Sequence, residues 1–256
     1  MSGDSARGFY DHLAATYHLL YRDWDRAITD QGRALDALIR GELGPGGRIV
    51  LDAAAGIGTQ SLGLAARGHT VIATDLSPAA TARATAEAHA RDLPLATAAA
   101  DMRALPFRSA WADVVVCADN ALPHLLTPPD LTAALTELRR VLKPGGLLLA
   151  TTRDYDALRI HRPTSTPPNS AVTPTARTVS FQLWHWDDEH YDLELFQLTE
   201  RNDSWTVDSA RSRYWALTRD QLAAFVLDAG FEHPTWHTPE DAGFFQPVLT
   251  ARKPGE

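Results

Sequence analysis

The chain has 256 residues, of which 45% are hydrophobic, and its formal net charge at pH 7 is −8. This length is enough for one large domain with an added subdomain. The acidic balance argues against a nucleic-acid partner, which would need clustered lysine and arginine. The only cysteine, Cys117, excludes an internal disulfide and a cysteine-based zinc site, and no metal site is predicted.

The first residues, MSGDSARGFYDHL, lack the apolar core of a secretion signal, and no stretch is long enough to cross a bilayer. We therefore expect a cytoplasmic protein with no membrane partner. The oligomeric state is not indicated by the sequence.

The first third of the chain predicts helices followed by alternating strands and helices. Residues 9–40 carry apolar and aromatic side chains at helical spacing, which predicts a helical cap over residues 1–44. The predicted strands that follow cover residues 48–52, 70–75, 95–99, 111–118 and 147–152. Continuous apolar strands separated by helices indicate a parallel sheet covered on both faces.

The pattern changes after Asp156. Residues 161–177 are rich in Pro, Ser and Thr and are predicted to be a loop, before three β-like runs at 178–186, 191–201 and 205–217. We expect residues 157–217 to form an antiparallel lid over the main sheet, covered on both sides. The capping box at Thr218 and Gln221 then starts a helix that returns the chain to the core, predicted as residues 45–156 and 218–256.

A glycine loop follows the first strand in "IVLDAAAGIGTQ". Gly56 and Gly58 stand where a strand meets a helix, and small residues there let a ligand approach the backbone N–H groups. The loop alone is equally consistent with a tight turn that binds nothing. Asp75 and Asp101 end the next two strands, at the edge where parallel sheets bind ligands, and Asp52 is placed to brace the loop. Together these residues favour a cofactor site.

Two cofactors fit such a loop, a nicotinamide dinucleotide and S-adenosylmethionine. The dinucleotide motif G-x-G-x-x-G needs a third glycine, but Ser61 stands at that position. A pyrophosphate also disfavours the preceding acidic residue, whereas the adenosyl sulfonium carries no phosphate. The sequence therefore favours S-adenosylmethionine, with S-adenosylhomocysteine as the product.

The motifs "LDAAAGIGTQ", "VIATDLSP", "AADMRALP", "VVVCADNALPHLL", "LKPGGLLLATTRDYD" and "FFQPVLTARKP" occur in the order found in class I methyltransferases. Together with the N-terminal "YDHLAATYHLLYRDW", they resemble the glycine/sarcosine N-methyltransferase-like group, which includes toxoflavin-type azapteridine N-methyltransferases. The resemblance implies an α/β, Rossmann-like fold. It would have a seven-stranded, mostly parallel sheet, N-terminal helices and an antiparallel three-stranded lid insertion.

The resemblance also implies roles for the matching residues. The predicted cofactor-binding residues are Tyr17, Tyr21, Trp24, Asp52, Ala54, Gly56, Gly58, Asp75, Leu76, Asp101, Met102, Cys117, Ala118 and Asn120. Among them Asp75 would hold the ribose and Asp101 the adenine. Ala53 and Ala55 depart from the residues common in the group's loop, but both are small enough to keep cofactor binding.

Methyl transfer mainly requires that the acceptor be aligned with the donor and that water be excluded. The predicted catalytic residues are His124, Arg153 and Tyr155. His124 could accept a proton or simply pack in its loop. In relatives, an arginine matching Arg153 pairs with a substrate carboxylate; it could instead contact ring carbonyls or form a salt bridge with Asp154 or Asp156. Tyr155 could bond the substrate or pack.

The lid is rich in tryptophan, which would suit a flat aromatic acceptor, although such residues usually belong to a core. The predicted substrate-binding residues are Tyr10, His18, Asn120, Arg153, Trp184, Trp186, Tyr214 and Phe245. The sequence thus predicts an N-methyltransferase for a small nitrogen heterocycle of secondary metabolism or antibiotic biosynthesis. A glycine or sarcosine N-methyltransferase, an O-methyltransferase and a non-catalytic cofactor-binding module are the alternatives.

Overall fold

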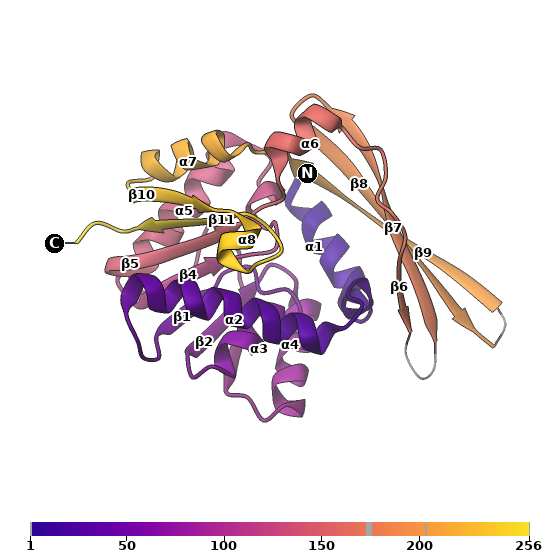
Figure 1. Cartoon of the computed structure of the whole chain (residues 1–256), viewed down its shortest axis with the longest axis horizontal. Helices are drawn as coiled ribbons and strands as arrows, with labels where there is room; N and C mark the ends of the chain where they lie inside the picture. Colours follow the sequence, from indigo (N-terminus) through magenta and orange to yellow (C-terminus); the bar gives the residue numbers. More distant parts are fainter. Residues whose placement is uncertain (1, 173–175, 203, 256) are drawn as a thin grey trace.

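The computed structural model describes residues 2–172, 176–202 and 204–255, and its main element is a seven-stranded sheet (Figure 1). The strand order is β10-β11-β5-β4-β1-β2-β3, with parallel pairing from β5 to β3 and antiparallel pairing of β11 with both neighbours. The strands are β1 (Ile49–Asp52), β2 (Thr70–Asp75), β3 (Leu95–Ala99), β4 (Ala112–Cys117), β5 (Leu142–Thr151), β10 (Glu232–His237) and β11 (Val248–Arg252). The predicted mostly parallel sheet of seven strands is confirmed.

Helices cover both faces of this sheet. One face packs against α5 (Pro128–Val141) and α7 (Arg219–Asp228), and the other against α2 (Trp24–Leu43) and α3 (Thr59–Ala65). The second face also carries α4 (Pro78–Ala90) and the short α8 (Pro239–Ala242). Consecutive β4 residues therefore alternate between two cores, and Val114 to Cys117 are all fully buried. This explains why the strands read as continuous apolar runs.

The contact between α2 and α3 depends on two glycines. A Cβ atom added at Gly32 would lie 2.5 Å from the backbone of Gly63, so the two helices approach each other at backbone level. This contact fixes α3, whose first turn continues the glycine loop. The predicted capping box at the start of α7 is present between Thr218 and Gln221.

A second, antiparallel sheet projects from the core (Figure 1). It contains β6 (Asn169–Val172), β7 (Arg177–Asp187), β8 (His190–Arg201) and β9 (Ser204–Trp215), in that order. The prediction of three strands was wrong by one, because β6 lies in the segment predicted as a loop. Tertiary contacts define this short edge strand: Asn169 pairs with Ser180 and donates a hydrogen bond to the Leu20 carbonyl at 2.8 Å. Residues 173–175 of that segment lie outside the described residues.

Helix α1 (Ser2–Leu13) lies between this second sheet and the core (Figure 1). Phe9 and Leu13 pack against Tyr191 and Tyr214 on the inner face of the sheet, together with α6 (Tyr155–His161). The prediction that the lid is covered on both sides was wrong. Its free end is open, and Val207 is 65% exposed. No helix in the described part of the chain has the length and apolar character needed to cross a bilayer.

Candidate active site

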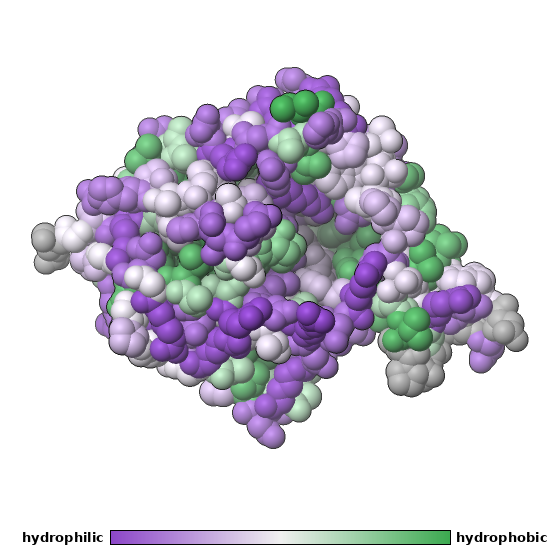
Figure 2. Space-filling model, in the orientation of Figure 1, coloured by the Kyte–Doolittle hydropathy of each residue, from purple (hydrophilic) through white to green (hydrophobic). Residues whose placement is uncertain are grey.

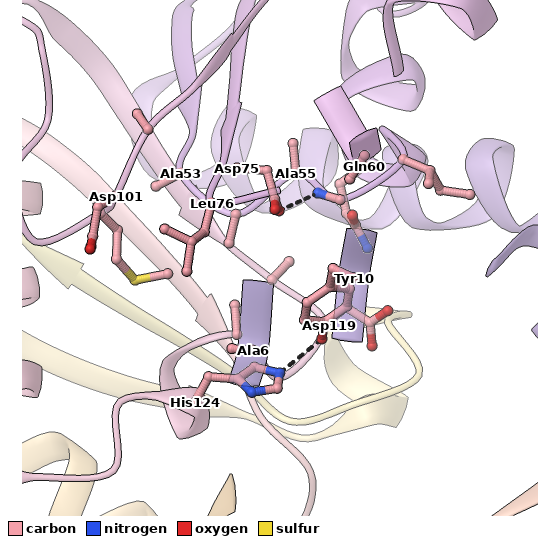
Figure 3. A pocket seen from close by; sticks show the side chains of 18 of the residues that line it. Ala6, Tyr10, Ala53, Ala55, Gln60, Asp75, Leu76, Asp101, Asp119 and His124 are labelled. Carbon is pink, nitrogen blue, oxygen red and sulfur yellow. Dashed lines mark hydrogen bonds between the residues drawn. The ribbon is translucent and has the colours of Figure 1, made fainter. Parts of the chain in front are cut away.

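A cavity of about 1050 Å³, including its mouth, lies at the carboxyl ends of β1, β2 and β4, where α1 covers it. The face in Figure 2 is hollowed between the core and the projecting sheet. The predicted residues that line the cavity are Tyr10, Tyr17, Tyr21, Ala54, Gly56, Asp75, Leu76, Asp101, Met102, Ala118 and His124. Several of them are drawn in Figure 3.

The glycine loop forms one wall. Gly56 and Gly58 have φ angles of 53° and 94°, which glycine adopts without steric cost. The two Asp75 carboxylate oxygens accept hydrogen bonds from the backbone N–H groups of Gly56 and Ser77, each at 2.8 Å; the former bond is marked in Figure 3. Asp75 thus joins the loop to the start of α4. Because each carboxylate oxygen has a second lone pair, Asp75 can still accept from ribose hydroxyls.

Two further predicted acids lie on either side of Asp75. Asp52 is buried behind the loop and accepts a hydrogen bond from the Ser61 hydroxyl at 2.6 Å, and burial raises the pKa of Asp52 to about 7. Asp101 lines the cavity and pairs with Arg103 at 2.6 Å. Although burial acts in the opposite direction, hydrogen bonds from Arg103 hold the pKa of Asp101 below its usual value. Arg103 also contacts Asp130 at 2.6 Å, which fixes the loop at this end.

Tyr10 and His124 meet on the opposite wall (Figure 3). The Tyr10 hydroxyl lies 2.8 Å from Nε2 of His124, whose Nδ1 lies 3.3 Å from the Ser212 hydroxyl. The Tyr214 ring packs on the imidazole with centroids 4.2 Å apart. Burial, followed by the positive charge of Arg153, lowers the pKa of His124 to about 3. His124 is therefore neutral at physiological pH and serves as a hydrogen-bond partner.

Arg153 lies behind this wall. Its guanidinium donates to the Tyr191 hydroxyl at 2.7 Å and lies over the rings of Trp184 and Tyr214, 4.8 and 5.4 Å from their centroids. The alternative of a salt bridge to Asp154 or Asp156 does not occur, because those carboxylates pair with Arg219. No carboxylate in the described part of the chain forms an ion pair with Arg153. Arg153 lines a groove with Phe245, Gln246 and Pro247, next to the main cavity.

Other predicted cofactor residues support the cavity without lining it. Trp24 donates from its indole to the Thr59 hydroxyl at 2.9 Å, behind the loop, and Gly58 is the N-cap of α3. Cys117 is fully buried, and burial raises the pKa of its thiol. Asn120 is buried and accepts from the backbone N–H of Arg153 at 3.1 Å.

Several predicted substrate residues lie in the aromatic core of the lid. Trp184 stacks on Tyr191 at 4.7 Å, and Tyr155 is 1% exposed with its hydroxyl 3.0 Å from that of Tyr191. The Trp186 indole donates to the Pro163 carbonyl at 2.9 Å. The remaining two lie elsewhere. His18 packs beside Trp24 at 5.9 Å, and Phe245 is 54% exposed at the edge of the groove.

Sequence reasoning missed a carboxylate on the cavity wall, Asp119. It accepts hydrogen bonds from the Tyr21 hydroxyl at 3.2 Å and from Nε2 of Gln246 at 3.3 Å, and burial raises its pKa. Asp119 and Asn120 are consecutive non-glycine residues with positive φ, at 54° and 68°, which is a strained arrangement typical of functional sites. The polar pair directly after a strongly apolar strand was the available signal. Gln60 and Thr59 also line the cavity.

Residues 50–146 match the family model described as Methyltransferase domain. A glycine/sarcosine N-methyltransferase of Parasynechococcus marenigrum (strain WH8102) is 39% identical over 153 residues, which is 58% of this chain and 54% of that protein. An S-adenosylmethionine-dependent methyltransferase structure from Clostridium acetobutylicum ATCC 824 has a TM-score of 0.74 at 14% identity, covering 96% of this chain and 99% of that chain. The SAM-bound amino pentose methyltransferase CalS10 from Micromonospora echinaspora has a TM-score of 0.74 at 20% identity, covering 93% and 95%.

The chain has the Rossmann-like fold of class I methyltransferases, and residues 50–146 match a methyltransferase domain, as the motif order predicts. Over about half of its length the chain is similar to glycine/sarcosine N-methyltransferases, the group that its motifs resemble. S-adenosylmethionine is the cofactor of this class, so the predicted cofactor is confirmed at that level. The chain spans about half the length of the curated relatives it matches.

Proposed function

We propose that the protein transfers a methyl group from S-adenosylmethionine to a nitrogen atom of a small molecule. One observation carries this proposal: a single cavity joins the loop and acid expected to hold the donor, Gly56 and Asp75, to the hydrogen-bonded pair Tyr10 and His124. A protein that only bound the cofactor would not need a hydrogen-bonded Tyr10–His124 pair in the same cavity.

S-adenosylmethionine would supply a methyl carbon activated by its positive sulfonium. The cavity suits this donor because Asp75 can accept from the ribose hydroxyls and Asp101 can reach the adenine. The rings of Tyr17 and Tyr21 add electron-rich surfaces that attract a cation. Helix α1 covers part of the cavity through Ala6 and Tyr10, which would help to exclude water from the reaction.

The Tyr10–His124 pair orients the acceptor. If the Tyr10 hydroxyl donates to neutral His124, its oxygen lone pairs are free to accept an N–H from the acceptor. The nitrogen lone pair then points along the line of attack. Holding reactants in such alignment can lower the barrier by roughly 7–11 kcal/mol.

For the acceptor, the favoured class is an amine that carries a carboxylate, as the names of the glycine/sarcosine N-methyltransferase relatives suggest. The support is Arg153, a largely enclosed guanidinium with no ion-paired carboxylate among the described residues and thus available to an acidic substrate. The second candidate is a ring nitrogen of an azapteridine-like heterocycle from secondary metabolism. The aromatic walls at Tyr10, Tyr17 and His124 support it, whereas Trp184 and Trp186 turn into the lid core.

We further propose that different segments of the chain have different functions. Residues 1–44 cap the cofactor, residues 45–156 and 218–256 bind it, and residues 157–217 shape the acceptor side. The structurally similar amino pentose methyltransferase CalS10, which is involved in calicheamicin biosynthesis, suggests an amino sugar as a further acceptor to test.

The test is methyl transfer from labelled S-adenosylmethionine to glycine, sarcosine, an amino sugar and an azapteridine. We expect labelling of a carboxylate-bearing amine, and we expect Arg153→Ala to raise its KM at least about tenfold while hardly affecting an uncharged ring. Arg211→Ala is the matched control, because Arg211 is exposed and pairs with Glu194 on the lid. Labelling of the azapteridine alone would favour the second candidate. Binding of S-adenosylhomocysteine without any transfer would contradict the proposed activity.

A further inference from the structure

The cavity wall contains a carboxylate whose hydrogen-bond partners are all neutral. Asp119 is the second residue after β4, and within the described part of the chain its side chain accepts only from the Tyr21 hydroxyl and the Gln246 amide. An enclosed carboxylate is costly unless a cation or several donors compensate it. The backbone at Asp119 is held in a left-handed conformation by two contacts to Thr151, from the Asp119 N–H to the hydroxyl and from the Asn120 N–H to the carbonyl.

The position of Asp119 places it toward the acceptor. Gln246, which donates to Asp119, also lines the neighbouring groove with Arg153, so this pair forms the wall between groove and cavity. Asp75 and Asp101, which are expected to hold the adenosine, come from the ends of β2 and β3, away from this wall. Asp119 therefore lies on the side of the cavity that faces Arg153 and away from the residues expected to hold the adenosine.

We propose that Asp119 binds the acceptor as an ammonium ion and takes its proton, so that the site selects basic amines over weakly basic ring nitrogens. This inference rests on the proposed N-methyl transfer. The ammonium N–H donates to the free lone pairs of the carboxylate, and one proton moves to Asp119, leaving a neutral amine. The nitrogen lone pair then forms the N–C bond as the C–S bond breaks, and sulfur keeps the electron pair.

The charges balance in this step. The positive charge of the sulfonium ends on the methylated nitrogen, and the proton from the ammonium ends on Asp119. Burial raises the pKa of Asp119 even though the positive charge of Arg153 and the hydrogen bonds from Tyr21 and Gln246 act in the opposite direction. Asp119 is therefore a better proton acceptor than an exposed aspartate, whereas neutral His124 with a pKa of about 3 is a poor one. Tyr10 and His124 thus orient the nitrogen, and Asp119 determines which nitrogen is accepted.

The experiment compares ammonium probes with hydroxyl analogues of similar shape. Glycine is paired with glycolate and ethylamine with ethanol, and binding is measured by calorimetry with and without S-adenosylhomocysteine. Asp119→Asn removes only the charge, because asparagine tolerates the left-handed region, and Asp119→Gly removes the side chain without backbone strain. Asp192→Asn is the control, since Asp192 lies on the exposed lid surface and pairs with Arg213.

We expect the wild type and Asp192→Asn to bind the ammonium member of a pair at least about tenfold more tightly. Asp119→Asn should bind the ammonium probes about 30-fold or more weakly than the wild type does, as expected when one partner of an enclosed charge pair is removed. Its preference for the ammonium member of each pair should therefore disappear. Its affinity for S-adenosylhomocysteine should change less than about twofold.

Three results would overturn the assignment: no ammonium preference in the wild type, a preference that persists in both Asp119 variants, or an equal loss of S-adenosylhomocysteine affinity. The last would mean that Asp119 holds the ammonium of the donor's methionine part. If the wild type did not bind S-adenosylhomocysteine at all, this result would instead contradict the proposed function. The titrations of the amine and hydroxyl probes in the absence of S-adenosylhomocysteine would still measure the ammonium preference.

Discussion

The Tyr10 hydroxyl lies 2.8 Å from Nε2 of His124, although 114 positions separate the two residues in the chain. Tyr10 belongs to α1, and His124 ends the short 3-10 helix η2 (Leu122–His124) that follows β4. The bond therefore connects the helix that covers the cavity to the strand end at its floor. Under the proposed function, covering the site and orienting the acceptor would both depend on the Tyr10 side chain.

Tyr10→Phe should lower kcat by roughly 2- to 10-fold, the value of one neutral hydrogen bond of about 0.5–1.5 kcal/mol. The ring would still pack on Phe9 and Tyr17, so the fold should be kept. Single-turnover rates, together with calorimetric affinity for S-adenosylhomocysteine, separate the two effects. Equal losses in rate and in cofactor affinity would show that the hydroxyl acts on the donor.

His124 should make stability depend on pH. The pKa of His124 is about 3 in the folded protein and about 6.5 in the unfolded chain. Between these two pH values the unfolded chain binds a proton at His124 and the folded protein does not. The stability contributed by neutral His124 is thus complete above pH 6.5 and is lost as the pH falls toward 3. Urea unfolding between pH 7 and pH 4.5 should show a smaller loss for His124→Gln than for the wild type. An identical loss in both would contradict the lowered pKa.

Asp75→Asn should weaken S-adenosylhomocysteine binding by roughly 10- to 150-fold, because hydrogen bonds to a charged group are worth about 1.5–3 kcal/mol. The variant replaces one oxygen that now accepts from Gly56 or Ser77 by an amide donor. Asp30→Asn, an exposed site on α2, is the control and should bind normally. Calorimetry of both variants checks this, and unchanged binding by Asp75→Asn would remove Asp75 from the ribose site.

Gly58→Ala should lower the free energy of unfolding by about 1–2 kcal/mol, because alanine is strained in the left-handed region. Here φ is 94°, and the added methyl would lie 3.2 Å from Cβ of Ala84. Gly41→Ala, in an ordinary helical position with open space around it, should instead be neutral or stabilise the protein slightly. Thermal melts compare the two, and equal shifts would mean that the loop is not constrained at Gly58.

The sequence predicts the core well because its signals are local. The run Val114 to Cys117 is apolar at every position, and this is the pattern of a strand buried on both faces. Asp75 likewise stands at the carboxyl end of a predicted strand, where the fold class places its ligands. The local pattern is sufficient to predict the buried strand, and the position of Asp75 in the chain is sufficient to place it at the ligand-binding edge of the sheet.

The remaining features depend on contacts that no local pattern records. The strand β6 forms because Asn169 finds partners in β7 and at Leu20, and α1 takes its place through contacts with the lid. The alternation of Trp184 and Trp186 shows that they share a face. It does not show that this face turns toward Tyr191 instead of the cavity. Asp119 was missed because an aspartate after a strand is common, and its significance comes from Gln246, far along the chain.

The most direct test of the account is a calorimetric titration of the purified protein with S-adenosylhomocysteine and, separately, with NADH. The account predicts one site per chain for S-adenosylhomocysteine, with no heat from the dinucleotide. Binding of NADH without binding of S-adenosylhomocysteine would contradict it.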